Sequence, residues 1–274
     1  MNGCREKYTP VYPSLHWGIS TLGCPDADLA QAAALADRNG IEYLEIRTVS
    51  GDNDVTKTLR LPENRPTAVR LTESGRVRVL DSSFRIASTD LAAHDALLDV
   101  ARTADEFNIP YIRLFGGFSG ELTGDILRQC MDNIMWFKSF GFRTRLALET
   151  HDGFSWSDRV VKLMELCGEE LPVIWDAHHT FQVGKEPFAE SLRLLKPFLV
   201  TIHFKDSHWD IAAEGGPQFI HDLPGAGEVP LTELFELLEQ EKITVPVVLE
   251  YEKLWRQYLP ELSEALTAWQ NLCR

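Results

Sequence analysis

Four ionisable residues stand at the ends of four short apolar runs in the second half of the sequence. The runs cover 146–149, 173–176, 200–203 and 247–250 and end in Glu149, Asp176, His203 and Glu250. Three carboxylates and one imidazole suit a divalent metal ion of hard-to-borderline character. Without an ion, three neighbouring carboxylates would repel one another, and at least one of them would hold a proton. The pattern therefore predicts that these four side chains bind one divalent metal.

The elements that must position these residues alternate along the chain. Strands are expected near 15–21, 43–47, 77–83, 111–115, 145–150, 173–176, 199–203 and 246–250, and helices at 26–39, 90–108, 123–140, 157–166, 188–195, 231–240 and 260–272. A helix expected within 48–74 is interrupted by Pro62 and Pro66. Eight strands, each followed by a helix, imply parallel strands and right-handed crossovers.

A closed (β/α)₈ TIM barrel fits this alternation, because that fold typically needs about 250 residues. The 274 residues are accordingly predicted to form a single domain, 1–274. An open doubly wound sheet is the competitor, but the turn at 21–25 lacks the glycine-rich phosphate cradle that such sheets often carry. In a barrel the carboxyl ends of the strands form the active site, so ligands from four successive strands, about 4.8 Å apart, reach one ion.

Several residues beside the four predicted ligands could contact a substrate. His151 shares the parity of Glu149, and it is either an acid–base group or a loop histidine bonded to backbone. One of His178 and His179 is expected to enter the site and polarise a carbonyl. Lys205 lies on the same side as His203, where it could bind an oxyanion or form a salt bridge with Asp206 or Glu252.

The opposite wall of the site is expected to carry cations and aromatic rings. Arg47, Arg85 and Arg113 follow or end earlier strands, and each could bind a carboxylate, a phosphate or sugar hydroxyls. Trp17 is one of several tryptophans near strand ends that could pack against a sugar or small ring. The segment 206–228 is long and glycine-containing, which makes it a candidate lid.

Composition limits the partners. The formal net charge of −14 argues against nucleic acid, because phosphate backbones recruit basic surfaces. No stretch is long and apolar enough to span a bilayer, and residues 1–7 show no signal peptide. The five scattered cysteines, with no Cys-x-x-Cys pair, indicate free thiols in a reducing cytoplasm. A cytoplasmic location and a small-molecule substrate are therefore expected, and a homo-oligomer is left open.

The motifs LETH at 148–151, DAHH at 176–179, IHFKD at 202–206, GAGEVP at 225–230 and LEYE at 249–252 stand together in this chain. With YIRLFGG at 111–117, they give it a resemblance to the sugar phosphate isomerase/epimerase-like family, which has the xylose isomerase-like barrel. The resemblance covers nearly the whole chain and is weakest at 48–74. It implies a single divalent metal, commonly Mn²⁺ with Mg²⁺, Co²⁺ or Zn²⁺ as alternatives, held by Glu149, Asp176, His203 and Glu250.

The resemblance also implies an activity. Glu149 and Glu250 would transfer the proton next to the carbonyl of a small polyhydroxylated compound, through a metal-stabilised enediolate. His179, His151 and Lys205 would orient and polarise the substrate. The function predicted first is therefore a sugar isomerase or epimerase of carbohydrate metabolism.

Two alternatives remain open. Epimerases of this kind often have a glutamate six residues after the first ligand, where this chain has Ser155. The Glu-Thr-His form also resembles metal-dependent dehydratases, such as those acting on 3-dehydroshikimate or a keto-cyclitol, in which the residue matched by His151 is an acid–base group. An apurinic endonuclease-like phosphodiesterase is less favoured, because the extra zinc-binding histidines of that branch are missing.

Overall fold

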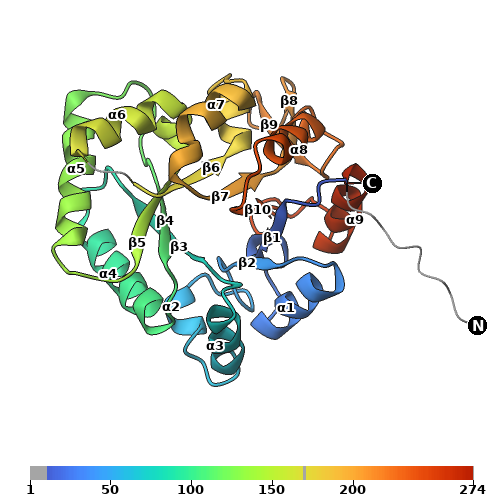
Figure 1. Cartoon of the computed structure of the whole chain (residues 1–274), viewed down its shortest axis with the longest axis horizontal. Helices are drawn as coiled ribbons and strands as arrows, with labels where there is room; N and C mark the ends of the chain where they lie inside the picture. The colour runs from blue at the N-terminus through green and yellow to red at the C-terminus, as the bar shows by residue number, and fades with distance from the viewer. Residues whose placement is uncertain (1–10, 169–170, 274) are drawn as a thin grey trace, which may run out of the picture.

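The computed structural model describes residues 11–168 and 171–273, and it confirms the predicted barrel. Eight parallel strands form one sheet in the order β2-β1-β10-β7-β6-β5-β4-β3 (Figure 1). The strands are β1 (His16–Ser20), β2 (Tyr43–Glu45), β3 (Val79–Arg85), β4 (Tyr111–Phe115), β5 (Arg145–Glu149), β6 (Val173–Asp176), β7 (Leu199–Phe204) and β10 (Pro246–Leu249). Each of them coincides with a strand expected from the sequence.

The two edge strands of this sheet also meet, which closes it into a barrel. Ile46 forms an isolated parallel bridge with Leu80, and the amide of Asp81 donates to the carbonyl of Ile46 at 3.3 Å. The site strands are in close register, with Asp176 opposite His203 and Val248 opposite His203 on the other side. Residues at the carboxyl ends of β5, β6, β7 and β10 are therefore neighbours in space.

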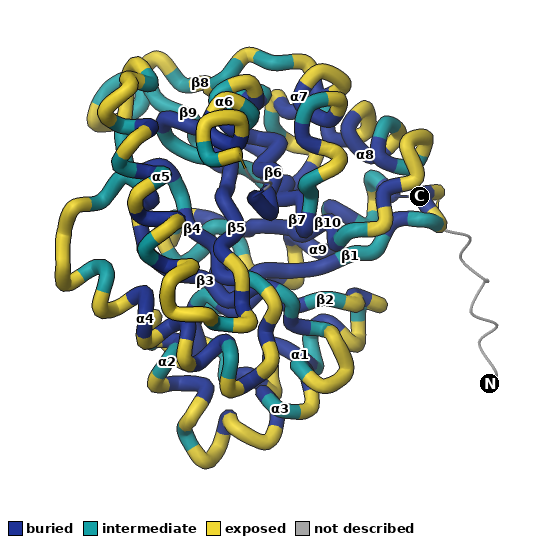
Figure 2. Tube along the Cα trace, turned by 60° about the vertical axis from the view of Figure 1, so that its left-hand side comes forward, coloured by how far each residue is buried: buried dark blue, intermediate teal, exposed yellow. Residues whose placement is uncertain are grey.

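Helices surround the sheet. The structure has α1 (Leu29–Arg38), α2 (Val55–Thr58), α3 (Arg65–Glu73), α4 (Leu91–Glu106), α5 (Gly124–Lys138), α6 (Ser157–Cys167), α7 (Phe188–Leu195), α8 (Leu231–Gln240) and α9 (Leu262–Leu272). In Figure 2 the strands are almost wholly buried, whereas the helices are buried on one side and exposed on the other. This is the division expected of amphipathic helices around a barrel.

The segment 48–74 folds differently from the sequence expectation. Pro66 lies in the first turn of α3, a position that needs no backbone N–H donor, so it begins this helix. The shorter α2 precedes it and is capped by Asp54, whose carboxylate accepts from the amides of Thr56 and Lys57. Two short helices therefore replace the single interrupted helix.

The interior of the barrel has an apolar layer below a charged one. Val79, Ala147, Ile174 and Val200 form a small buried cluster of their own. Two residues after the first three of these come Asp81, Glu149 and Asp176, which point to the same side of the sheet because strand side chains alternate.

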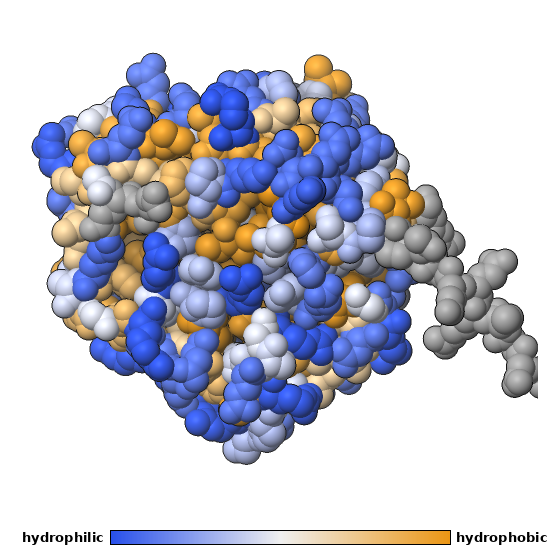
Figure 3. Space-filling view, viewed as in Figure 1, coloured by the Kyte–Doolittle hydropathy of each residue, from blue (hydrophilic) through white to orange (hydrophobic). Residues whose placement is uncertain are grey.

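On the outer surface, the face drawn in Figure 3 is hydrophilic around its rim and shows hydrophobic side chains towards its middle.

The segment 206–228, expected to be a loop, contains a two-stranded antiparallel hairpin. Its strands are β8 (Asp206–Asp210) and β9 (Gln218–Asp222). The Asp206 carboxylate accepts hydrogen bonds from four backbone amides, including those of Gly225, Gly227 and Val229. The return to α8 (Leu231–Gln240) is thus fixed to the end of the barrel.

The structure also bears on the expectations about membrane-spanning helices and about the cysteines. Among the described helices, none has the length and apolarity needed to cross a membrane. Cys24, Cys130 and Cys167 are free thiols. Cys4 and the N-terminal segment, for which no signal peptide was expected, lie outside the described residues.

Candidate metal centre

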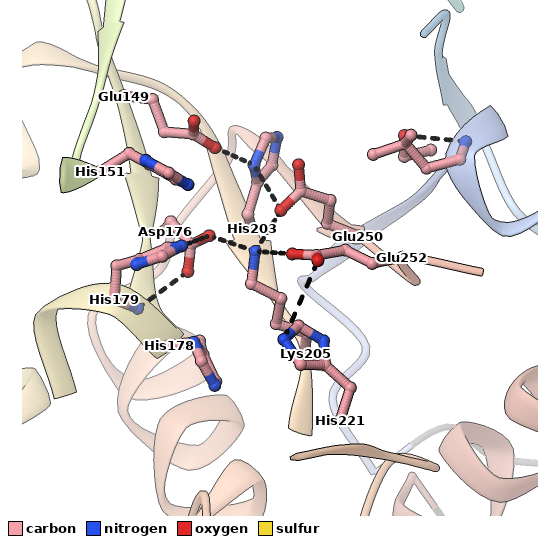
Figure 4. Close-up of polar contacts among 12 residues, drawn as sticks. Glu149, His151, Asp176, His178, His179, His203, Lys205, His221, Glu250 and Glu252 are labelled. Atoms are coloured by element: carbon pink, nitrogen blue, oxygen red, sulfur yellow. Dashed lines mark hydrogen bonds and ion pairs between the residues drawn. The ribbon is translucent and has the colours of Figure 1, made fainter. Parts of the chain in front are cut away.

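The four predicted ligands converge. Glu149, Asp176 and His203 come from β5, β6 and β7, and Glu250 directly follows β10. One ligand atom from each of the four lies within 4.8 Å of those of the others, and all four residues are buried. Figure 4 shows their side chains pointing toward a common centre. The arrangement is that of a metal-binding cluster at the carboxyl end of a barrel.

Glu149 is held by a chain of alternating charges. Its Oε2 accepts from Arg113 Nε at 2.7 Å, and Arg113 Nη2 also contacts this oxygen. Arg113 Nη1 donates to Asp81 Oδ1 at 2.8 Å, and Asp81 Oδ2 lies 3.0 Å from Arg47 Nε. Burial raises the pKa of Glu149, but Arg113 and His203 outweigh it and hold that pKa well below its usual value. Glu149 is therefore ionised and held in a fixed orientation.

His203 lies between carboxylates on both sides of its ring. Its Nδ1 is 2.8 Å from Glu149 Oε1 and 3.8 Å from Glu250 Oε2. Its Nε2 is 2.8 Å from Oε2 of Glu45, the last residue of β2. Burial lowers the pKa of His203, but Glu45, Glu250 and Glu149 together raise it well above its usual value. The sequence reasoning missed Glu45, although an acidic residue near the end of an apolar strand was the signal used for the four ligands.

Lys205 brings a buried ammonium into the cluster. Its Nζ lies 2.8 Å from Asp176 Oδ2, 2.5 Å from Glu250 Oε2 and 2.9 Å from Glu252 Oε1. Burial raises the pKa of Asp176 to about 6, although Lys205 acts in the opposite direction. The salt bridge to Glu252, one of the two expected from the sequence, is present, so Lys205 is both an ion-pair partner and a neighbour of the candidate ligands.

The residues present fit a divalent cation. Among the described residues, carboxyl groups outnumber permanent cations at this point by three, with the imidazole of His203 beside them. The carboxyl groups are those of Glu45, Asp81, Glu149, Asp176, Glu250 and Glu252, and the cations are Arg47, Arg113 and Lys205. Glu45 Oε1 is buried without a hydrogen-bond partner, and Asp176 Oδ2 is buried with the Lys205 ammonium 2.8 Å away. Oxygen and imidazole donors in excess of positive charge are what a divalent ion requires.

A cavity of about 190 Å³ adjoins the cluster, and its lining includes several of the predicted substrate contacts. It is lined by Leu22, Arg47, Arg113, Phe115, His151, Lys205, Glu250, Glu252 and Trp255. Glu250 and Lys205 thus face both the ligand group and the space where a substrate would sit.

Two histidines lie together at the edge of the cluster. The ring centroids of His151 and His179 are 4.1 Å apart, and His151 Nδ1 contacts Asp152 Oδ1 at 2.8 Å. Burial lowers the pKa of His151, but Asp152 and Glu149 raise it above its usual value. Burial, and then the charges of His151 and Lys205, place the pKa of His179 well below its usual value. Two neighbouring imidazoles of different basicity therefore stand side by side, with His151 the more basic.

Other predicted contacts do not line the cavity. His178 is buried with its Nε2 2.7 Å from Ser207 Oγ, and one of its ring nitrogens lies within 4.8 Å of ligand atoms of Asp176 and His179. Arg85 is exposed, and its guanidinium lies over the ring of Phe115 at 6.0 Å. Trp17 packs edge-on against Phe204, Phe235 and Trp269, and it does not line the cavity.

The fold and the site define an α/β barrel with a candidate metal centre at the carboxyl ends of its strands. Residues 24–270 match the family described as the xylose isomerase-like TIM barrel, and the chain belongs to this family. No curated protein matches the sequence.

Solved structures share the barrel at low sequence identity. The probable 3-DHS dehydratase AsbF from Bacillus anthracis, involved in petrobactin synthesis, aligns with a TM-score of 0.71 at 16% identity, covering 94% of this chain and 99% of that one. IOLI protein, solved with a zinc atom, gives 0.67 at 15%, covering 94% and 96%. A D-tagatose 3-epimerase-like protein gives 0.65 at 14%, with the same coverage.

Proposed function

We propose that this protein is a divalent-metal-dependent enzyme that removes the proton beside the carbonyl of a small polyhydroxylated compound. The observation that carries the proposal is the convergence of Glu149, Asp176, His203 and Glu250 next to a cavity of about 190 Å³. An ion bound there, with Mn²⁺ the first choice and Mg²⁺, Co²⁺ or Zn²⁺ the others, supplies positive charge to the carbonyl and hydroxyl oxygens of the substrate.

The two glutamates contribute differently. Both oxygens of Glu149 are engaged by Arg113 and His203, which leaves this side chain little freedom to take up a proton. Glu250 lines the cavity, and its Oε2 is 2.5 Å from Lys205 Nζ. We assign proton removal to Glu250 and proton return to the ammonium of Lys205 rather than to Glu149, since isomerisation and epimerisation need both steps.

The substrate is held by the remaining groups around the cavity. Arg47 uses Nε for Asp81, so its two terminal nitrogens remain available for substrate oxygens. His151 lines the cavity, and the neutral ring of His179 lies beside it. Arg85 could reach an anionic group from the rim. Arg113 is committed to Asp81 and Glu149, so its main role is to position Glu149.

Dehydration is a second candidate that a specific observation favours. The His151–Asp152 pair gives the cavity an acid–base group separate from the glutamates. Ser155 is fully buried, and its hydroxyl donates to the carbonyl of Asp152, so it does not replace the epimerase glutamate. Such a site would remove the same kind of proton and then expel hydroxide. The likeness in fold to a probable dehydratase and to an epimerase-like protein agrees with both candidates.

The partners and compartment proposed are correspondingly simple. A small-molecule substrate fits the cavity, and the net charge of −14 argues against nucleic acid. The free thiols of Cys24, Cys130 and Cys167 favour the reducing cytoplasm. The chain is proposed to act as one domain, 1–274.

Metal analysis followed by incubation with ketoses and keto-cyclitols in heavy water tests the proposal. We expect about one bound ion per chain. Deuterium entry beside the carbonyl without loss of water identifies an isomerase, and new conjugated absorbance identifies a dehydratase.

Glu250→Gln should bind the ion more weakly and lose turnover. Glu233→Gln, on the exposed face of α8, is the matched control and should behave like the wild type. Full activity of Glu250→Gln would rule out the role given to Glu250.

A further inference from the structure

Glu45 reaches the candidate metal centre from the far side of the barrel. It ends β2, which is separated from β7 by β1 and β10 in the sheet, yet its Oε2 lies 2.8 Å from His203 Nε2. The side chain is 5% exposed. A glutamate that crosses the barrel to reach one imidazole is a specific arrangement that the four-ligand description does not explain.

The two nitrogens of His203 face different surroundings. Nδ1 points to the ligand side, with Glu149 Oε1 at 2.8 Å and Glu250 Oε2 at 3.8 Å. Nε2 points to Glu45. A neutral imidazole has one nitrogen with a free lone pair and one that carries a proton. For His203 to coordinate an ion beside Glu149 and Glu250, the lone pair must be on Nδ1 and the proton on Nε2.

Glu45 has few other contacts that would account for its position. Among the ion pairs of the described residues, its only partner is His203. Its second oxygen, Oε1, is buried without a hydrogen-bond partner. Arg47, two residues along the chain, pairs with Asp81 instead. The buried carboxyl group of Glu45 therefore depends on a single hydrogen-bond partner, His203 Nε2.

We propose that Glu45 is the positioning residue of this site, which fixes the proton of His203 on Nε2 and directs the Nδ1 lone pair toward the ion. Carboxylate partners of this kind set the tautomer and ring orientation of metal-binding histidines and raise their basicity. The inference rests on the proposed metal-binding function. It assigns to β2 a part in a site whose four ligands come from β5, β6, β7 and the end of β10.

Zinc binding by variants at position 45 tests this role. The affinity for Zn²⁺ alone is measured by competition with a chromophoric chelator for the wild type, Glu45→Gln, Glu45→Asp and Glu45→Ala. Loss of a carboxylate partner typically weakens metal binding about 10–100-fold. We expect a loss of that size for Glu45→Gln and Glu45→Ala, and partial recovery for Glu45→Asp. Glu42→Gln, three residues earlier and exposed beside His16, is the control and should match the wild type.

A second readout separates positioning from a general effect on the fold. In the zinc-loaded protein labelled with ¹⁵N-histidine, NMR should show His203 coordinated through Nδ1 and protonated on Nε2. The unfolding midpoint of metal-free Glu45→Gln shows whether this near-isosteric variant folds as the wild type does.

The possible outcomes distinguish this inference from the proposed function. Wild-type zinc affinity in folded Glu45→Gln and Glu45→Ala, or coordination of His203 through Nε2, would overturn the role of Glu45 while leaving the metal centre in place. A wild-type protein that takes up no zinc would overturn both.

Discussion

Arg113 is the residue on which the orientation of Glu149 most depends. It is buried, and it joins the carboxylates of Asp81 and Glu149 through three nitrogens of one guanidinium. An arginine used in this way leaves Glu149 Oε1 directed toward His203 and the centre of the cluster. The planar fork of arginine makes this geometry possible, and a lysine could not reproduce it.

Replacing Arg113 should therefore destabilise the whole protein. Arg113→Ala would leave the buried Glu149 without its arginine and Asp81 with Arg47 as its remaining arginine partner. Removing one partner of a buried ion pair typically costs about 3–5 kcal/mol of unfolding free energy. Urea unfolding of the metal-free protein measures this loss. Arg128→Ala removes an exposed arginine 3.6 Å from Asp125 and is expected to change stability by less than about 1 kcal/mol. If Arg113 acted mainly on substrate, its variant would unfold like the wild type and show only a raised KM.

At the scale of elements, the hairpin β8–β9 shows how one side chain organises a connection. The Asp206 carboxylate receives the amides of Ser207, Gly225, Gly227 and Val229 at 2.8–3.1 Å. A Cβ on Gly227 would lie 2.3 Å from Asp206 Oδ1, so glycine is required for this close approach. The amide of His221 also donates to the Tyr258 hydroxyl at 2.9 Å, which ties β9 to the segment before α9.

Asp206→Asn should loosen this connection. One carboxylate oxygen becomes an NH₂ group that faces backbone donors, and hydrogen bonds to charged acceptors are worth about 1.5–3 kcal/mol each. We expect a loss of about 2–3 kcal/mol in unfolding free energy and faster amide exchange at Gly225 and Gly227. Asp210→Asn is the control, because Asp210 accepts only from Ala212 at the exposed end of the hairpin. Unchanged exchange at both glycines would show that Asp206 does not hold the segment.

At the scale of the whole molecule, the sequence predicted the eight strands and the barrel because the barrel strands are short apolar runs separated by amphipathic helices. The convergence of the four candidate ligands could be predicted for the same reason, since a strand that ends on an ionisable residue places it at a known end of the barrel. Pro66 was misinterpreted because a proline in the first turn of a helix and one in its interior look alike without the helix boundary. The hairpin at 206–222 was not predicted, because its two strands are separated by residues 211–217 and not by the short turn that signals a hairpin in a sequence.

Residue roles were harder to predict than residue positions. Trp17 stands on a barrel strand, but its ring packs against α8 and α9, and the sequence does not specify which way a strand residue turns. Glu45 lies in the strand expected at 43–47, but only Arg47, at the end of that strand, was predicted to reach the site. Its contact with His203 joins residues 158 positions apart. Local patterns predict which strand end a side chain occupies, whereas partners across the barrel depend on closure of the whole sheet.

The excess of buried carboxylates predicts that ion binding stabilises the folded protein in a pH-dependent way. The folded-state pKa of Asp176, about 6, lies above its ordinary value of 3.8, so ionising this group destabilises the metal-free fold as the pH rises through that window. A bound ion requires Asp176 ionised and His203 Nδ1 unprotonated. Protons therefore compete with the ion, and the pKa of His203, raised well above its usual value, extends this competition above pH 6.

Unfolding in urea with and without Mn²⁺ between pH 8 and pH 5 measures this competition. At pH 8, an ion concentration about 100 times the dissociation constant should add about 2.7 kcal/mol to the unfolding free energy. The same ion concentration should add progressively less toward pH 5, because Asp176 and His203 hold their protons there. Glu250→Gln, which lacks one ligand oxygen, should show a smaller gain at every pH. A gain that stays constant from pH 8 to pH 5 would mean that the ion binds elsewhere, since both protonating groups belong to the proposed centre.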